Sequence, residues 1–167
     1  TSATEDIAYS YSITTSDDDS DSSDSWTITC TTCPSWLSIS HTAGASTATL
    51  SGTPLNANVG DNSVVISVAD AASATGTQSF TIAVANTNDA PTITSTAVTS
   101  ATEDTAYTYT VTTADDDSDV ITLTGTTVPS WLTFTASTGV LAGTPLNANV
   151  GDNSVVITAS DSNGGSV

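Results

Sequence analysis

An internal repeat is the feature that most restricts how this chain can fold. Residues 52–66 (GTPLNANVGDNSVVI) recur without a change as residues 143–157. Shorter blocks at residues 1–6, 16–21 and 34–37 return, nearly unchanged, at 99–104, 114–119 and 129–132. Because Thr1 returns as Thr99, the period at the N-terminal end is 98 residues, which suits one small β-sandwich. The repeat predicts two domains, at residues 1–90 and 91–167.

Each copy alternates apolar and polar side chains with the period of a β-strand. Such a period places one face of a strand on a core and the other in water. The first copy shows it at Ile7, Tyr9, Tyr11 and Ile13, at Val64, Ile66 and Val68, and at Phe80, Ile82 and Val84; the second begins with Thr105, Tyr107, Tyr109 and Val111. Turn residues separate these runs at 43–44, 52–54 and 58–62. Short strands at this spacing predict an all-β fold of two tandem antiparallel sandwiches.

The two copies differ at their ends. Residues 92–98 form an expected first strand that the first copy lacks, and the second copy stops at Val167 before any counterpart of residues 80–84. The second sandwich should therefore lack its last strand. Either the sequence is cut from a longer array, or a neighbouring subunit supplies the strand to the open edge.

The charge of the chain excludes several classes of partner. Its 167 residues carry 18 acidic side chains and no Lys or Arg, for a formal charge of −18. Such a chain cannot neutralise phosphates, which argues against nucleic acid and against anionic membranes. No apolar run reaches the roughly 20 residues of a membrane span. No signal peptide is visible, so we expect any secretion signal to lie outside this sequence.

The two cysteines, Cys30 and Cys33, form a C-x-x-C pair. One pair provides too few ligands for structural zinc, and the βαβ setting of a thioredoxin motif is absent. Gly125 and Val128 replace the pair in the second copy, so the fold does not require it. A local disulfide, free thiols and redox or metal chemistry all remain open, and an exported protein favours the disulfide.

The carboxylates lie at the inferred ends of strands, and the strand directions bring many of them to the joint between the copies. Because a strand separates Glu5 from Asp17, these side chains should lie at opposite ends of the first sandwich. The predicted ligands at the joint are Glu5, Asp6, Asp61, Asn86, Asn88, Asp89, Asp115, Asp117 and Asp161. The outer end of the first copy should collect Asp17, Asp19 and Asp70, and that of the second copy Glu103, Asp104 and Asp152.

Such clusters of hard oxygen ligands without a neighbouring cation favour calcium, which accepts six to eight oxygens in flexible geometry. An Asp-x-Asp at a strand end directs two carboxylates the same way, so Asp18 and Asp116 should face solvent. A single acidic loop is more often simply solvated. The convergence of three segments on one joint favours Ca²⁺ over that simpler interpretation.

These residues resemble cadherin repeats, and more closely the bacterial cadherin-like repeats of the dystroglycan type and the immunoglobulin-like repeat family. The linker at residues 86–91 is similar to the family's Asp-x-Asn-Asp joint. Glu5 and Glu103 match its acidic residue before the second strand, residues 17–19 and 115–117 its Asp-x-Asp, and Asp70 and Asp161 the Asp after the sixth strand. Residues 50–54 and 141–145 are similar to the Gly-x-Pro signature of the bacterial group. Asn86 replaces the usual first Asp, and the acidic loop before the sixth strand is absent.

The resemblance implies calcium-rigidified modules of large extracellular bacterial surface proteins, often adhesins, in which repeats act as spacers or cell-adhesion modules. Neighbouring repeats or subunits would be the partners, with a surface glycan as a further possibility. Two alternatives stay open: a subunit of an extracellular filament completed by strand exchange, and a carbohydrate-binding module.

Other chemistry finds little support in the sequence. His41 is the single histidine and fits a surface loop, and without Lys the chain cannot form Schiff bases. There is no Gly-x-Ser-x-Gly elbow. Trp36 and Trp131 follow Pro-Ser in both copies and favour packing over sugar stacking, and Trp26 suits the core. We therefore expect no enzymatic activity.

Overall fold

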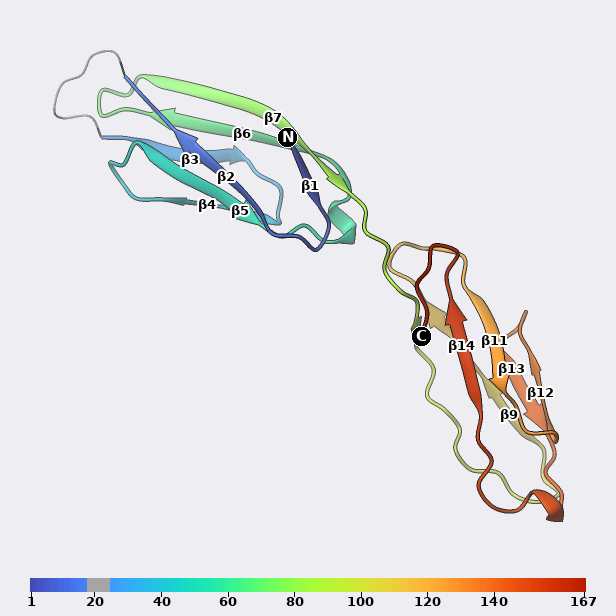
Figure 1. Cartoon of the computed structure of the whole chain (residues 1–167). Coiled ribbons are helices and arrows are strands. Elements are labelled where there is room, and N and C mark those ends of the chain that lie inside the picture. Colours follow the sequence, from blue (N-terminus) through green and yellow to red (C-terminus); the bar gives the residue numbers. More distant parts are fainter. Residues whose placement is uncertain (18–24) are drawn as a thin grey trace. The chain divides into compact units, whose positions relative to one another are not determined.

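The computed structural model describes residues 1–17 and 25–167, and it divides into two compact units (Figure 1). Unit 1 spans Thr1–Thr87 and unit 2 spans Asn88–Val167. This boundary lies three residues before the domain boundary predicted from the sequence. In both units the described residues form β-strands joined by turns and one short 3-10 helix, so the all-β prediction is confirmed.

Unit 1 packs two sheets face to face. One sheet has the strand order β1-β7-β6-β3, with bounds Ser2–Thr4, Thr75–Ala85, Gly60–Ala69 and Thr27–Thr32. The other has the order β2-β5-β4, with bounds Tyr9–Thr14, Thr47–Gly52 and Leu37–His41. The 3-10 helix η1 (Asn56–Asn58) precedes β6. Among the described strands of unit 1, β1 and β7 pair in parallel, and the other pairs are antiparallel.

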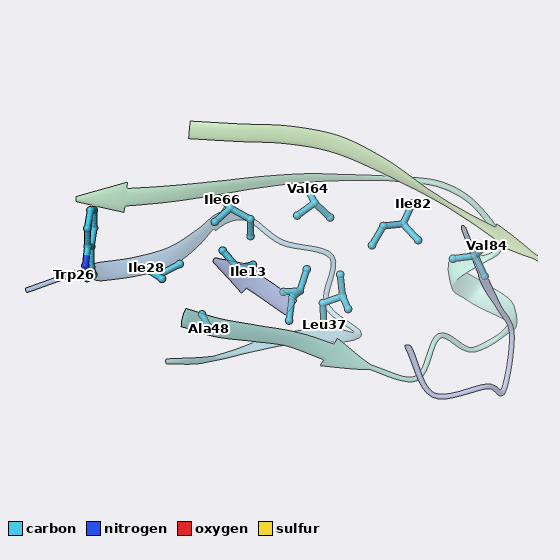
Figure 2. Close-up of a cluster of buried hydrophobic side chains, with 10 residues drawn as sticks. Ile13, Trp26, Ile28, Leu37, Ala48, Val64, Ile66, Ile82 and Val84 are labelled. Carbon is cyan, nitrogen blue, oxygen red and sulfur yellow. The ribbon is translucent and has the colours of Figure 1, made fainter. Parts of the chain in front are cut away.

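The core of unit 1 lies between these sheets, as Figure 2 shows. Alternate residues of β6 and β7 point inward, so Val64, Ile66, Ile82 and Val84 are at most 4% exposed. They meet Ile13 of β2 and Leu37 of β4 from the facing sheet, with Trp26 at one end, as expected. The period-two prediction is thus confirmed for β6 and β7.

Two local predictions in unit 1 are wrong. Ile7 is 60% exposed, because a tight turn precedes β2: the Ile7 N–H donates to Thr4 O, and Asp6 adopts φ 60°. Residues 60–62, expected in a turn, belong instead to β6 because β7 pairs with them. Partner strands, rather than the polar residues themselves, decide this boundary.

Unit 2 repeats most of this plan with fewer pairings. Its sheets have the orders β12-β13-β9, β11-β14 and β10-β8. Their bounds, in chain order, are β8 Thr92–Ile93, β9 Tyr107–Thr110, β10 Thr113–Ala114, β11 Thr122–Thr127, β12 Leu132–Thr135, β13 Val140–Gly143 and β14 Val156–Ser160, with the 3-10 helix η2 at Asn147–Asn149. Val111, Leu132, Leu141 and Ala159 are buried.

The ends of unit 2 differ from expectation in one respect and match it in another. Of the first strand expected at 92–98, only Thr92–Ile93 is regular, and it pairs with β10. No strand of unit 2 corresponds to β7, as predicted.

A tryptophan–asparagine pair ties the same two segments together in each unit. Trp36 Nε1 donates to Asn62 Oδ1 at 3.0 Å, and the Asn62 amide donates to the carbonyls of Asn58 and Gly60. Trp131 and Asn153 repeat these bonds. Each indole also meets a tyrosine ring edge-on, with centroids 5.8 Å apart in both units. These contacts give both tryptophans a structural role.

The two cysteines and the histidine of unit 1 also have structural roles. Cys30 and Cys33 form a disulfide, which is the alternative that we expect for an exported protein. His41 ends β4, so its assignment to a surface loop is wrong. Its ring nitrogens lie 3.0 Å from Trp26 O and 3.2 Å from Thr47 O.

Candidate metal centre

Three carboxylates gather in the loop after β10. Asp115, Asp117 and Asp119 each offer an oxygen within 4.8 Å of the other two. Asp115 accepts two hydrogen bonds that hold this loop together. Its backbone carbonyl accepts from Ser118 N–H, and its Oδ1 accepts from Asp119 N–H at 3.0 Å. Alternate residues point the same way, so Asp116 between them is exposed, as predicted.

Asp161 forms a second anchor at this end of unit 2, directly after β14. Its Oδ1 accepts N–H groups from Asn163, Gly164 and Gly165 at 2.7–2.8 Å. Its Oδ2 accepts from Asn88 Nδ2 at 3.0 Å. The Asn88 amide, followed by these backbone donors, holds the pKa of the Asp161 carboxyl below its ordinary value. The ionised carboxylate therefore organises the turn that follows β14.

The first residues of unit 2 are fastened to these carboxylates. Asn88 donates to Asp161, and Asp89 N–H donates to Asp117 Oδ2 at 2.6 Å. Asn163 Nδ2 donates to Asp119 Oδ2 at 2.6 Å. The strands explain this meeting: β11 and β14 pair Thr122 with Ser160, so the loops before β11 and after β14 lie at the same end.

One oxygen of the cluster fits a cation that the protein itself does not provide. Asp115 Oδ2 is buried and accepts no hydrogen bond from any described residue. A buried carboxylate oxygen without a partner is costly, and the chain contains no Lys or Arg to neutralise it. The donor set consists of carboxylate oxygens, which are hard ligands of the type that calcium accepts. The residues of this end therefore fit a calcium ion.

The unit 1 residues predicted at the joint divide into one buried and several exposed side chains. Glu5 is only 1% exposed, its Oε2 accepts from Thr87 N–H at 3.2 Å, and its own N–H donates to Ala85 O. The predicted ligands Asp6, Asp61 and Asn86 are exposed. Glu5 thus fastens the last residues of unit 1, just as Asp117 and Asp161 fasten the first residues of unit 2.

The outer-end sets predicted from the sequence are less organised. Asp17 is exposed, Asp70 Oδ1 accepts from Ala74 N–H in the β6–β7 turn, and Asp19 lies outside the described residues. Glu103, Asp104 and Asp152 are all exposed. Among the described residues, none of these side chains belongs to a group of three carboxylates close enough to share one ion.

Two members of the unit 2 cluster were missed by the sequence analysis. Asp119 completes the series Asp115, Asp117, Asp119, whose i, i+2, i+4 spacing was the available signal. Asn163 follows Asp161 by two residues and carries no signal of its own, because its role depends on the turn that Asp161 organises.

Comparison with known proteins gives a clear family and a general fold. The family model described as "Putative Ig domain" matches the chain twice, at residues 1–85 and 90–167. No curated protein matches the chain.

Among solved structures, the human desmocollin-1 ectodomain is 14% identical over all of this chain and 33% of that chain, with a TM-score of 0.50. Human protocadherin-24 EC1-2 is 17% identical over 98% and 83% of the two chains, with a TM-score of 0.49. An endo-fucoidan hydrolase of glycoside hydrolase family 107 is 30% identical over 99% of this chain, with a TM-score of 0.47; this chain spans only 26% of its length. The desmocollin likeness shows the fold alone.

Proposed function

Because the chain belongs, through both of its units, to the family of immunoglobulin-like domains described as "Putative Ig domain", we propose that it is a non-enzymatic tandem module of an extracellular surface protein or adhesin. In this proposal the module acts as a spacer, and calcium binds at the acidic end of unit 2. The ligands are Asp115, Asp117, Asp119 and Asp161. The observation that carries the proposal is the buried, unpartnered Oδ2 of Asp115 inside a group of carboxylates.

Calcium would supply the positive charge that this end of the unit lacks. Three of the four carboxylates already accept hydrogen bonds from Asn88, Asp89 or Asn163. Those bonds hold the carboxylates in place but do not supply the positive charge that would offset the repulsion among Asp115, Asp117 and Asp119, whose oxygens lie within 4.8 Å of one another. Neutralising the group should therefore also strengthen the attachment of Asn88 and Asp89 to unit 2.

The attachment of these two residues links metal binding to the spacer role. Asn88 and Asp89 begin unit 2, and Thr87, which Glu5 holds, ends unit 1. Ordering residues that follow directly on an anchored residue reduces the freedom of the linker. We expect calcium to extend and stiffen the two-unit chain, and Pro91, which is buried, adds a fixed φ next to the linker.

The proposal that the chain is not an enzyme has local support. His41 contacts two backbone carbonyls within unit 1. Asp161 and Asp70 accept hydrogen bonds from backbone N–H groups of the turns that follow them, which is a structural role.

Extracellular placement is supported by the Cys30–Cys33 disulfide, since such bonds persist in oxidising compartments. Within the described part of the chain, no helix has the length and apolar character needed to cross a membrane.

Calcium titration calorimetry of the whole chain tests the proposal. Affinity should fall in the range of extracellular modules, with Kd about 10⁻⁴ to 10⁻³ M. Asp115→Asn and Asp117→Asn should each weaken it roughly tenfold or more. Asp116→Asn is the matched control, because it removes the same charge from an exposed position in the same loop. Equal losses in all three variants would indicate diffuse counterion binding and overturn the site.

Small-angle scattering with calcium and with a chelator tests the spacer role separately. With calcium, the maximum dimension of the chain should be larger and the range of dimensions in its ensemble narrower. An unchanged distribution, alongside the expected calorimetry, would retain the metal site but contradict stiffening.

A further inference from the structure

The Cys30–Cys33 disulfide spans the place where β3 bulges and ends. The pairing of β3 with β6 shifts in register between Cys30 and Thr32, and Cys33 lies just beyond the strand. The two cysteines are only three positions apart in sequence. A disulfide that closes so short a loop restricts the unfolded chain less than one that joins distant segments. Its stabilisation of unit 1 by this route is therefore small for a disulfide.

Unit 2 forms the same bulge without the bond. There Gly125 and Val128 stand in place of the cysteines, and the register of β11 against β14 shifts between Gly125 and Thr127. Thr31 Oγ1 donates to a carbonyl of β6 at 3.2 Å, and Thr126 Oγ1 donates to a carbonyl of β14 at 3.2 Å. The bulge therefore depends on strand pairing and not on the two sulfurs.

The turn after the bulge is also the same in both units. Leu37 N–H donates to Pro34 O at 3.0 Å, and Leu132 N–H donates to Pro129 O at 2.9 Å. Unit 2 therefore shows this loop folded with no disulfide in it. Opening the bond in unit 1 should leave the loop and its neighbouring strands in place.

The two sulfurs differ in their access to solvent. Cys33 is exposed, whereas Cys30 is half-buried and packs against the core of unit 1. An incoming thiolate therefore meets the sulfur of Cys33 first. Cys30 Sγ lies 3.2 Å from Thr32 O, so a thiol released from Cys30 has a hydrogen-bond acceptor already in place. This acceptor favours the protonated thiol over the thiolate, and only the thiolate attacks a disulfide, so the return reaction is disfavoured.

The surroundings of the disulfide carry no acidic side chain. Residues 25–42 contain no Asp or Glu, and neither do residues 65–69 of β6, which pair with β3. All 18 acidic residues of the chain lie elsewhere. A thiolate is an anion, so it approaches this part of unit 1 against less repulsion than at the acidic ends of the strands.

We propose that Cys33 is a covalent attachment site for an aliphatic thiol, carried either by a small molecule or by an exposed cysteine of another polypeptide. The thiolate attacks Cys33 Sγ, and a new S–S bond forms there as the Cys30–Cys33 bond breaks. Cys30 leaves as a thiolate and takes a proton from water. One disulfide replaces another, so the step consumes neither an oxidant nor a reductant.

Brief treatment of the whole chain with cysteamine near neutral pH, followed by trapping of free thiols with N-ethylmaleimide, tests this proposal. A second arm replaces cysteamine by a synthetic peptide that contains one cysteine among Gly, Ser and Lys. After peptic digestion, tandem mass spectrometry should find the mixed disulfide on Cys33 about tenfold or more in excess over Cys30, with the maleimide on Cys30. Amides of β3 and β6 should stay protected from hydrogen exchange in the adduct.

The matched control is the double variant Cys30→Gly, Cys33→Val, which gives unit 1 the residues of unit 2. It should form no adduct and should keep the β3 and β6 amides protected. Reaction in both arms would support attachment of small thiols and of polypeptides, and reaction with cysteamine alone would support the site for small thiols.

Three results would overturn the proposal. An adduct that forms only after denaturant unfolds unit 1 would show that folded unit 1 shields the disulfide. Equal adducts on both cysteines would contradict the assignment of Cys33. Loss of amide protection in β3 and β6 once the bond opens would show that the disulfide is needed to hold the strands together.

Discussion

Val64 and Val155 occupy the same place in the same fifteen-residue sequence, yet one is 1% exposed and the other 37%. Glu5 and Glu103 follow the same four residues, and only Glu5 is buried. Elsewhere the units agree closely: the Trp36–Asn62 and Trp131–Asn153 hydrogen bonds differ by 0.1 Å (3.0 and 2.9 Å). The comparison separates the contacts that the repeated sequence forms in both units from those that it forms only where β7 is present.

The largest effect should come from two glycines at which the units agree. A Cβ on Gly52 would overlap Trp36 O, and one on Gly143 would overlap Trp131 O, so backbone would have to move in either unit. Gly52→Ala and Gly143→Ala should each lower the free energy of unfolding of their own unit by about 3 kcal/mol. Residue-resolved hydrogen exchange measures each unit separately. A large loss of unfolding free energy in one unit only would contradict the expectation that Gly52 and Gly143 have the same role in the two units.

The next effect should differ between the units. Val64→Ala opens a cavity in a closed core and should cost unit 1 about 2 kcal/mol. Val155→Ala should cost unit 2 about 1 kcal/mol or less, since its side chain already meets solvent. The same exchange measurement applies. Equal costs would show that residues 151–155 are ordered in solution without a partner strand.

Glu5 and Glu103 provide a smaller contrast of the same kind. Glu5→Ala removes the acceptor of Thr87 N–H and should cost unit 1 about 1.5 kcal/mol. Glu103→Ala should change unit 2 by no more than about 0.5 kcal/mol. Denaturant unfolding in the presence of a chelator excludes any contribution from metal. A cost for Glu103→Ala that matches that of Glu5→Ala would contradict the exposed position of Glu103.

The smallest expected effect is the loss of order in the 161–165 turn at low pH. The lowered pKa of Asp161 means that its stabilisation of the 161–165 turn is complete above the ordinary Asp pKa of about 3.9 and is lost as pH falls through the lower folded value. The protection factors of the amides in this turn, measured in chelator and corrected for the intrinsic pH dependence of exchange, should fall on acidification. Asp161→Asn should show lower protection factors at neutral pH and little further change in acid. An identical acid response in the variant would place the titrating group elsewhere.

The sequence predicted the structure best where the alternation of apolar side chains and the pairing of strands lead to the same conclusion. Alternation located Val64 and Ile82 in the core, and strand direction placed Asp115, Asp117 and Asp161 at one end of unit 2. It misplaced Ile7, whose burial is decided by the Asp6 turn rather than by alternation.

What the repeated sequence did not predict has a common physical origin. Glu103 is exposed, although Glu5, within the same six-residue sequence, is buried. Burial there comes from Ala85 and Thr87, which lie 80 and 82 residues away in sequence. Asn163 is similar, because its contact with Asp119 spans 44 residues. Contacts of this range follow from completed tertiary structure, which a local pattern does not encode.

The central claim is that calcium binds at the acidic end of unit 2, and amide NMR of the whole chain during a calcium titration tests it most directly. With calcium raised to about 10 mM, we expect the amides of residues 88–89, 115–119 and 161–165 to shift together along one binding curve. Shifts confined to exposed acids such as Asp116 and Asp152, or the absence of any saturating shift at Asp115, Asp117 and Asp119, would contradict it.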